Sequence, residues 1–470
     1  MSIYAVESAI TEWNTLTDTT VKALAGPVKR FFIDIITRDI DLVASILDLV
    51  DNSVDSAHEL RPDGDFSGLK IEVVANDKEF SIVDNCAGID VHDAKTYVFR
   101  LGRPSDIEGS EGSIGQFGVG MKRALFKLGW AFVVDSVSAT GHFTVDLDVR
   151  KWEKTPDWEI ELTVHDRDRK ASTGTTIIVN ELHASIKAAL GRDDVLGRLR
   201  EDLKSKHRLA IENGLQLVLN GKPLNPIPSQ LAYGENIKPL MKSFDVHTAI
   251  GTIVGVEIFV GVIAESVANE DAAPENSKEA AREAGWHVFG NSRLLLASDR
   301  SNTTGWGGSG NMPMYHNQYG RFRGYVFMYS KDSNSLPWNT MKTGVDSSDP
   351  TWTKIRGEMI TAGKQVVTLL NHLKNERTGE NKEADVPISR ALEAAQSFTI
   401  TQLKAIEPSS PLTYPEPNPE LEKGDRFKKI AFSVDAEAFL EVSEMVGEKT
   451  AAKVGRATFD HFYRTQIAEG

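Results

Sequence analysis

Residues 41–57 read DLVASILDLVDNSVDSA and carry the strongest structural signal in the chain. Their apolar residues recur at spacings of one, three or four, which predicts a helix with one buried stripe. The stripe consists of Val43, Ile46, Leu47, Val50, Val54 and Ala57. Asp48, Asn52 and Asp55 are separated by four and three residues, so they share a different face. A carboxamide there can ligate Mg²⁺ while a carboxylate orients or deprotonates a water, although an ordinary solvated face is the alternative.

The next stretch, GLKIEVVANDKEFSIVDNCAGID at residues 68–90, predicts two strands joined by a turn at Asn76–Asp77. Asp84 ends the second strand and is followed by a turn that contains Gly88. A carboxylate in that place can accept two hydrogen bonds, which suits an exocyclic amine such as that of adenine. A plain Asp-Asn turn after a strand is the alternative.

A glycine cluster follows in EGSEGSIGQFGVGMKRALFKLG, residues 108–129. Three glycines allow the backbone to approach a phosphate closely: Gly115, Gly118 and Gly120. A helix is expected to start at Met121, so its free N–H groups would face the anion, and Lys122 would add a cation. The cluster matches neither the Walker pattern nor the dinucleotide-binding pattern, which argues against P-loop and Rossmann folds.

The fourth motif is GTTIIV at residues 174–179, a turn that leads into a strand. The order DLVDNSVDSA, DNCAGI, IGQFGVGMK and GTTIIV resembles the GHKL, or Bergerat-fold, ATPases. That superfamily holds gyrase B, the heat-shock chaperone ATPases, MutL, sensor histidine kinases and MORC proteins. IGQFGVG is similar to the chaperone form, whereas DLVDNSVDSA and the Lys after GVGM resemble MORC proteins and their prokaryotic relatives.

The resemblance implies that the chain binds ATP and Mg²⁺ and hydrolyses ATP to ADP and phosphate. Asn52 would ligate the Mg²⁺, and Asp48 would take the place of the general base. Asp84 would bind the adenine amine, directly and through a water shared with Thr175, and Gly88 would make room for the base.

Further residues would contact the nucleotide if the resemblance holds: Asp55, Ile89, Gly115, Gln116, Phe117, Gly118, Val119, Gly120 and Lys122. Residues 100–114 would form the mobile part of a lid that orders on nucleotide binding.

Two positions depart from the family pattern. The usual base is Glu, and Asp48 is one methylene shorter, which is expected to slow hydrolysis unless the helix lies closer. Cys86 replaces the first Gly of the adenine turn, which costs about 1 kcal/mol only if its φ is positive. Cys86 is also the single cysteine, so it is expected to be a small buried hydrophobe.

Composition restricts the setting in which the protein acts. One cysteine in 470 residues and no recognisable signal peptide predict a reducing cytoplasm. The longest apolar run, residues 251–263, is interrupted by Glu257, so no membrane span is expected. A net charge of −14 argues against a surface that binds nucleic acid without specificity, but it leaves room for a local basic groove.

The predicted architecture is an α/β sandwich ATPase domain (1–190), an α+β transducer-like, ribosomal S5-like domain (191–375), a helix with a Pro-rich linker (376–423) and a strand-helix-helix tail (424–470). A helix is expected over residues 388–405. In related transducers a basic residue reaches the γ-phosphate. Lys342, in the turn-rich LPWNTMKTG, is the candidate, and a surface lysine is the alternative.

Three functions remain open. The first is a MORC-like, ATP-gated homodimeric clamp that acts with DNA or a protein partner, for example in antiviral defence. The second is a heat-shock-type chaperone ATPase, against which the short tail argues. The third is a nucleotide-sensing interaction protein with little turnover, which Asp48 and Cys86 would suit.

Overall fold

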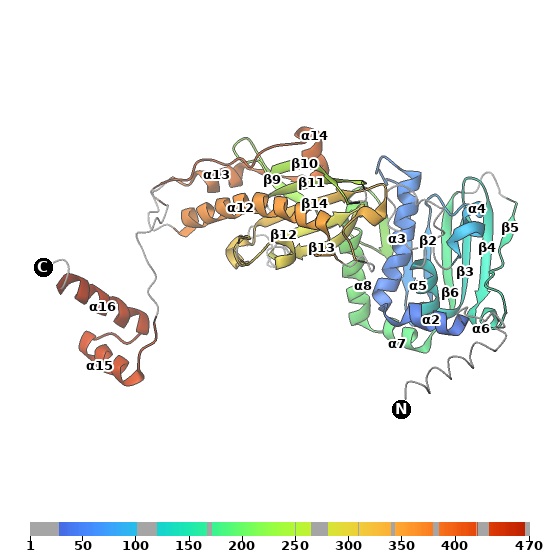
Figure 1. The fold of residues 1–470 in the computed structure, drawn as a ribbon, viewed down its shortest axis with the longest axis horizontal. Coiled ribbons are helices and arrows are strands. Elements are labelled where there is room, and N and C mark those ends of the chain that lie inside the picture. The colour runs from blue at the N-terminus through green and yellow to red at the C-terminus, as the bar shows by residue number, and fades with distance from the viewer. Residues whose placement is uncertain are drawn as a thin grey trace, which may run out of the picture. The chain divides into compact units, whose positions relative to one another are not determined.

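The computed structural model describes residues 28–100, 120–166, 172–249, 251–264, 281–308, 310–339, 344–378, 385–419, 421 and 432–465. These residues form a mixed α/β structure (Figure 1). They divide into two compact units. The first holds the described residues up to Thr378 together with Val386–Pro417, and the second holds Asp385 and the described residues from Asn418 onward.

The first sheet of the first unit has the strand order β5-β4-β3-β6-β2-β1-β7-β8. Neighbouring strands are antiparallel except β1 and β7, which are parallel. The strands are β1 (Lys70–Ala75), β2 (Phe80–Asp84), β3 (Gly129–Val137), β4 (His142–Asp148), β5 (Thr163–His165), β6 (Gly174–Leu182), β7 (Gln216–Leu219) and β8 (Lys222–Pro223).

One face of this sheet carries the hydrophobic core of the N-terminal half, which consists of the described residues from 28 to 224. The predicted stripe of the 41–57 helix is buried there, packed with α5 and the inward residues of β1, β2, β3 and β6. The opposite face is more open, since Val83 is 44% and Ile178 is 38% exposed. The helices of this half are α2 (Lys29–Arg38), α3 (Leu42–Leu60), α4 (Val91–Asp93), the π-helix Ala94–Val98, α5 (Gly120–Leu128), α6 (Val149–Trp152), α7 (Ala184–Leu190), α8 (Asp193–Lys206) and α9 (Arg208–Glu212).

A second, five-stranded sheet has the order β10-β11-β14-β12-β13, and only its β12–β14 pair is parallel. The nearly continuous burial of β12 and β14 shows that both faces of this sheet are covered. Its strands are β10 (Leu240–His247), β11 (Ile253–Val262), β12 (Gly285–Gly290), β13 (Arg293–Asp299) and β14 (Phe322–Tyr329). Short 3₁₀ helices lie at Asn302–Thr304, Asn317–Tyr319 and Ser333–Ser335.

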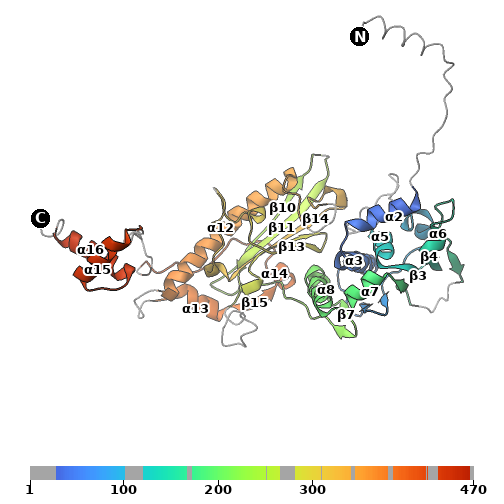
Figure 2. The ribbon, with the colours of Figure 1, turned by 90° about the horizontal axis from the view of Figure 1, so that it is seen from below.

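The two faces of the second sheet have different covers (Figure 2). The long helix α12 (Pro350–Thr378) packs on one face through Trp352, Ile355 and Met359. The other face contacts α14 (Ile400–Ile406) through Ile400 and Leu403, next to the small sheet formed by β9 (Gln230–Tyr233) and β15 (Gln396–Thr399).

The prediction of a single helix over residues 388–405 is wrong. The structure has α13 (Pro387–Ala394), then β15, then α14. The break occurs because residues 396–399 pair with β9. Thr399 then caps α14 through a capping box with Gln402.

The second unit contains α15 (Ala436–Val446) and α16 (Ala451–Tyr463). The strand expected before them lies mostly outside the described residues. Among the residues that the structure describes, no helix has the length and apolar character needed to cross a membrane.

Candidate functional site

Helix α3 presents the first two residues predicted to form the site. The helix starts at Leu42 because the Asp41 carboxylate accepts a hydrogen bond from the Val43 N–H (2.7 Å). One turn apart, the Asn52 side-chain amide donates to the Asp48 carbonyl (2.9 Å). This bond uses the amide nitrogen of Asn52 and leaves its amide oxygen to act as an acceptor.

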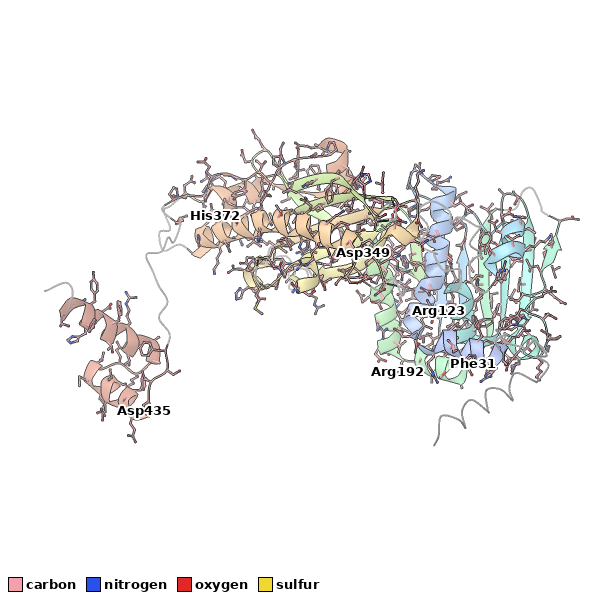
Figure 3. All side chains as sticks on the ribbon, in the orientation of Figure 1. Phe31, Arg123, Arg192, Asp349, His372 and Asp435 are labelled. Carbon is pink, nitrogen blue, oxygen red and sulfur yellow. The ribbon has the colours of Figure 1, made fainter. Side chains whose placement is uncertain are left out.

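The Asp48 carboxylate forms an ion pair with Arg123 on α5, with Nη2 and Oδ2 2.5 Å apart. Figure 3 shows Arg123 on α5. Gly120 begins α5 so close to Asp48 that an added Cβ would lie 3.6 Å from Oδ2. The start of α5 therefore lies beside the predicted base, and a helix start in that place suits an anion between the two helices.

Asp84 ends β2 inside a small hydrogen-bonded cluster and is only 8% exposed. Its Oδ2 accepts from the Ser53 hydroxyl (2.7 Å), and its Oδ1 accepts from the backbone N–H groups of Cys86 (3.0 Å) and Thr175 (3.1 Å). Burial raises the pKa of Asp84, and these hydrogen bonds oppose the rise. The Thr175 hydroxyl bonds to Ser136 (2.9 Å), so the β2, β3 and β6 ends are joined at this point.

The turn after Asp84 is shaped by Gly88 and Cys86. Gly88 has a φ of +74°, and a Cβ there would lie 2.1 Å from the Val137 carbonyl oxygen, so only glycine fits. Cys86 is fully buried, and no positive φ is found there. The strain considered for a side chain at residue 86 is therefore absent. Burial, together with the neighbouring Asp84, raises the pKa of the Cys86 thiol and makes it unreactive. Next along the turn, the Ile89 N–H donates to Ser136 (2.8 Å).

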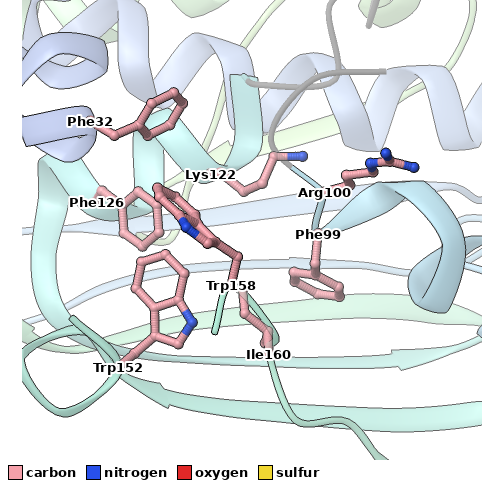
Figure 4. Close-up of a pocket in the computed structure, with 8 residues that line it drawn as sticks. All are labelled: Phe32, Phe99, Arg100, Lys122, Phe126, Trp152, Trp158 and Ile160. Atoms are coloured by element: carbon pink, nitrogen blue, oxygen red, sulfur yellow. The ribbon is translucent and has the colours of Figure 1, made fainter. Parts of the chain in front are cut away.

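The Lys122 side chain lies in a different environment, next to Val98 and an aromatic pocket. Its ammonium donates to the Val98 carbonyl (2.5 Å), and the side chain is 3% exposed. Burial lowers the pKa of Lys122 to about 8. The side chain lines a pocket of about 310 Å³ with the following residues: Phe32, Phe99, Arg100, Phe126, Trp152, Trp158 and Ile160 (Figure 4). Its contact with a phosphate stays a prediction.

The remaining predicted residues divide into two groups. Asp55 lines a cleft of about 1040 Å³ together with His58, Glu59 and the loops around Asn291 and Ser330 of the second sheet. The others lie outside the described residues: Gly115, Gln116, Phe117, Gly118, Val119 and Lys342.

The residues on α3 and α5 fit a magnesium nucleotide. Within the described ranges, no group of three or more His, Cys, Asp or Glu side chains could hold a metal by itself. One amide oxygen on α3 and the phosphates of a nucleotide are a donor set that suits Mg²⁺, which keeps several waters when bound.

Sequence reasoning missed several contacts of these residues. Arg123 was signalled only by its position three residues after Gly120. Nothing in the sequence indicated that Ser53 and Ser136 would support Asp84 and Thr175. Asp51, which is buried beside the predicted site, was also missed.

Comparison with known proteins agrees with this geometry. Residues 40–175 match the family model of the histidine kinase-, DNA gyrase B- and HSP90-like ATPases. The matched region begins just before α3 and ends at Thr175, and it contains Asp48, Asn52 and Asp84. No curated protein matches the chain. The match supports a GHKL-type ATPase domain that binds ATP.

Proposed function

We propose that the chain is a slowly hydrolysing ATPase that uses ATP to switch between an open form and a closed homodimer. The observation that carries the proposal is the position of Asp48 against the start of α5, with Asn52 one turn further along α3 and the Asp84 cluster at the strand ends of the adjoining sheet. This arrangement supplies an acid-base group, a metal ligand and an adenine acceptor within the region similar to known ATPases.

Each residue has a distinct role in the proposed reaction. Asp84, held by Ser53 and Thr175, accepts the adenine amine. Asn52 offers its amide oxygen to Mg²⁺, which neutralises phosphate charge when bound. Asp48 orients the attacking water and accepts its proton, since its carboxylate lies beside Gly120 at the start of α5.

The wider role is part of the same proposal. The second sheet takes the place of a transducer, and Lys342 would sense the γ-phosphate. ATP would favour the dimer through contacts made only when that phosphate is present. A DNA or protein partner in a MORC-like, cytoplasmic defence role is the setting that the motif resemblance favours.

The test is phosphate release and molar mass by light scattering, with and without Mg-ATP, for the full chain and for Asp48→Ala. Wild type is expected to release phosphate slowly and to dimerise with ATP. Asp48→Ala is expected to bind ATP, lose release at least 100-fold and remain dimeric. Asp63→Asn, which removes an exposed carboxylate from a turn, is the matched control. Absence of both ATP binding and dimerisation in wild type would refute the proposal.

A nucleotide sensor with little turnover is the second candidate, and the Asp48–Arg123 ion pair favours it. Arg123 engages Oδ2 of Asp48, so the carboxylate is restrained by a cation. If this restraint limits hydrolysis, Arg123→Gln will raise phosphate release at least threefold, whereas Arg38→Gln, at an exposed position, will not. A fall in release would instead assign Arg123 to orienting Asp48 or binding phosphate.

A further inference from the structure

The junction between α8 and α9 contacts both the second sheet and helix α3. Lys206 donates to a backbone carbonyl of β13 (3.1 Å), and Arg208 donates to Nδ1 of His287 in β12 (3.1 Å). Between them, His207 places its Nε2 3.9 Å from Oδ1 of Asp51 on α3. Three consecutive residues thus join the second sheet to the helix that carries the predicted base.

Asp51 also forms a buried ion pair with Arg293, the first residue of β13. Each of the two residues is 4% exposed. Asp51 lies in the sequence between Asp48 and Asn52. A movement of Arg293 that displaces Asp51 would therefore displace both of these residues. Burial lowers the pKa of Arg293 to about 10, and the negative charge of Asp48 opposes this change. Arg293 therefore lies within electrostatic reach of Asp48 as well as in contact with Asp51.

Through its strand partner Gly290, Arg293 is also connected to the segment that contains Trp338. Arg293 pairs with Gly290 across the β12–β13 hairpin. A Cβ on Gly290 would lie 3.2 Å from the Trp338 ring, so the indole packs directly on the hairpin. Trp338 forms a β-bridge with Val345, which joins the described segments 337–339 and 344–346, together called the loop base below. This loop base, the hairpin and α3 are consequently in continuous contact.

We propose that Arg293 is a positioning residue for the nucleotide site, through which the second sheet and helix α3 move together. The proposal rests on the proposed ATPase function. When nucleotide binding shifts α3, the Asp51–Arg293 pair carries the shift to the β12–β13 hairpin and to the loop base. The same pair transmits movements of the second sheet back to Asp48 and Asn52, because coupling between two sites is reciprocal.

The physical reason is that separating the Asp51 carboxylate from the Arg293 guanidinium costs free energy. Two buried opposite charges lose their mutual compensation when they separate, so the two elements are expected to move as one body. Removing one partner leaves a buried charge and risks unfolding, whereas replacing both by apolar residues of similar size is often tolerated.

The first experiment therefore uses the full chain with the double replacement Asp51→Leu/Arg293→Met. It measures thermal unfolding, affinity for Mg-ADP and for a non-hydrolysable ATP analogue, and kcat separately from KM. We expect a folded protein whose Mg-ADP affinity is within threefold of wild type. Its preference for the ATP analogue and its kcat are both expected to fall at least tenfold. Arg293→Lys, which keeps the charge, should retain most of the kcat.

The matched control is Arg323→Met, since Arg323 is also a buried arginine of the second sheet but donates to carbonyls of its own chain segment, Gly320 and Phe322. This variant should keep the preference for the ATP analogue whatever its loss of stability. A folded double variant with both kcat and analogue preference within twofold of wild type would overturn the proposal.

A second measurement on wild type makes the result independent of whether the double variant folds. Amide hydrogen exchange at residues 288–296 is expected to slow at least threefold when Mg-ADP is replaced by the ATP analogue, with β4 as an unaffected reference. Equal exchange with both nucleotides would overturn the coupling. Failure of the proposed function would appear differently, as a wild-type protein that binds neither nucleotide, and would remove both proposals.

Discussion

Gly88 and Gly64 allow the effect of crowding to be separated from that of backbone strain. Both have positive φ, +74° and +79°, but only Gly88 faces a carbonyl that a Cβ would overlap, while Gly64 faces open space. Gly64→Ala is expected to cost about 1 kcal/mol through strain alone. Gly88→Ala is expected to cost about 2–4 kcal/mol and to weaken ATP binding. Urea unfolding and nucleotide titration of both variants check this, and equal losses would contradict it.

Lys122 is expected to make the folding stability of the protein depend on pH. Its folded-state pKa of about 8 lies below the ordinary 10.5, so between these values the unfolded chain binds more protons than the folded one. Folding stability therefore rises with pH through this window, and is lower below it. Between pH 7 and 9.5 wild type should gain about 2 kcal/mol relative to Lys122→Met.

Chemical unfolding of the two proteins at pH 7 and 9.5 measures this difference. Lys151→Met is the control, because the Lys151 side chain is 85% exposed. Parallel pH profiles for wild type and Lys122→Met would show that the ammonium of Lys122 is solvated in solution.

Prediction from sequence worked best where the information is local. The buried stripe of α3, the two strands before Asp84 and a helix after the glycine cluster are confirmed, because each depends on periodicity or on a turn within a few residues. The Asp51–Arg293 pair and the Ser136–Thr175 bond could not be predicted, since they join residues distant in sequence that only the finished fold brings together.

At the scale of elements, two hairpin turns have the same backbone conformation but different residues. Asn291 (φ 42°) and Ser292 (φ 69°) join β12 to β13, whereas Asn220 (φ 50°) and Gly221 (φ 73°) join β7 to β8. Positive φ at both positions is typical of a type I′ turn, for which Asn-Gly is preferred.

Ser292→Gly is therefore expected to stabilise the second sheet by about 1 kcal/mol, and Gly221→Ser to destabilise the first sheet by a similar amount. Gly221 has open space around it, so the second change tests strain alone. Thermal melting of the two variants provides the measurement. A loss of stability in Ser292→Gly would mean that the serine side chain makes a contact worth more than the strain.

Errors in the element predictions arose where tertiary pairing overrides local preference. The helix expected over 388–405 is interrupted because residues 396–399 complete a sheet with β9, a partner more than 160 residues earlier. The 29-residue helix α12 was not predicted from the sequence. Its apolar residues do not form one clear stripe, because the helix packs against β10, β11, β14 and α13 along its length.

At the scale of the whole molecule, the chain leaves the first unit after Thr378 and returns to it over Val386–Pro417. The returning segment supplies β15, α14 and two backbone hydrogen bonds between Met241 and Ser410. A chain that ends at Pro417 is therefore expected to stay folded and to keep ATP binding. A chain that ends at Thr378 is expected to aggregate, because it exposes the strand edges of β9 and β10. Light scattering of the two truncated proteins distinguishes these outcomes.

The same returning segment has a consequence for synthesis in the cell. After β10 has left the ribosome, residues 248–410 must still be added before its edge at Met241 meets Ser410. At ~5–20 residues per second this takes roughly 10–30 s, during which the apolar face under α14 has no cover from its own chain. The first sheet, whose last strand ends at Pro223, can close much earlier. We therefore expect the nascent protein to depend on general chaperones for its second half and much less for its first.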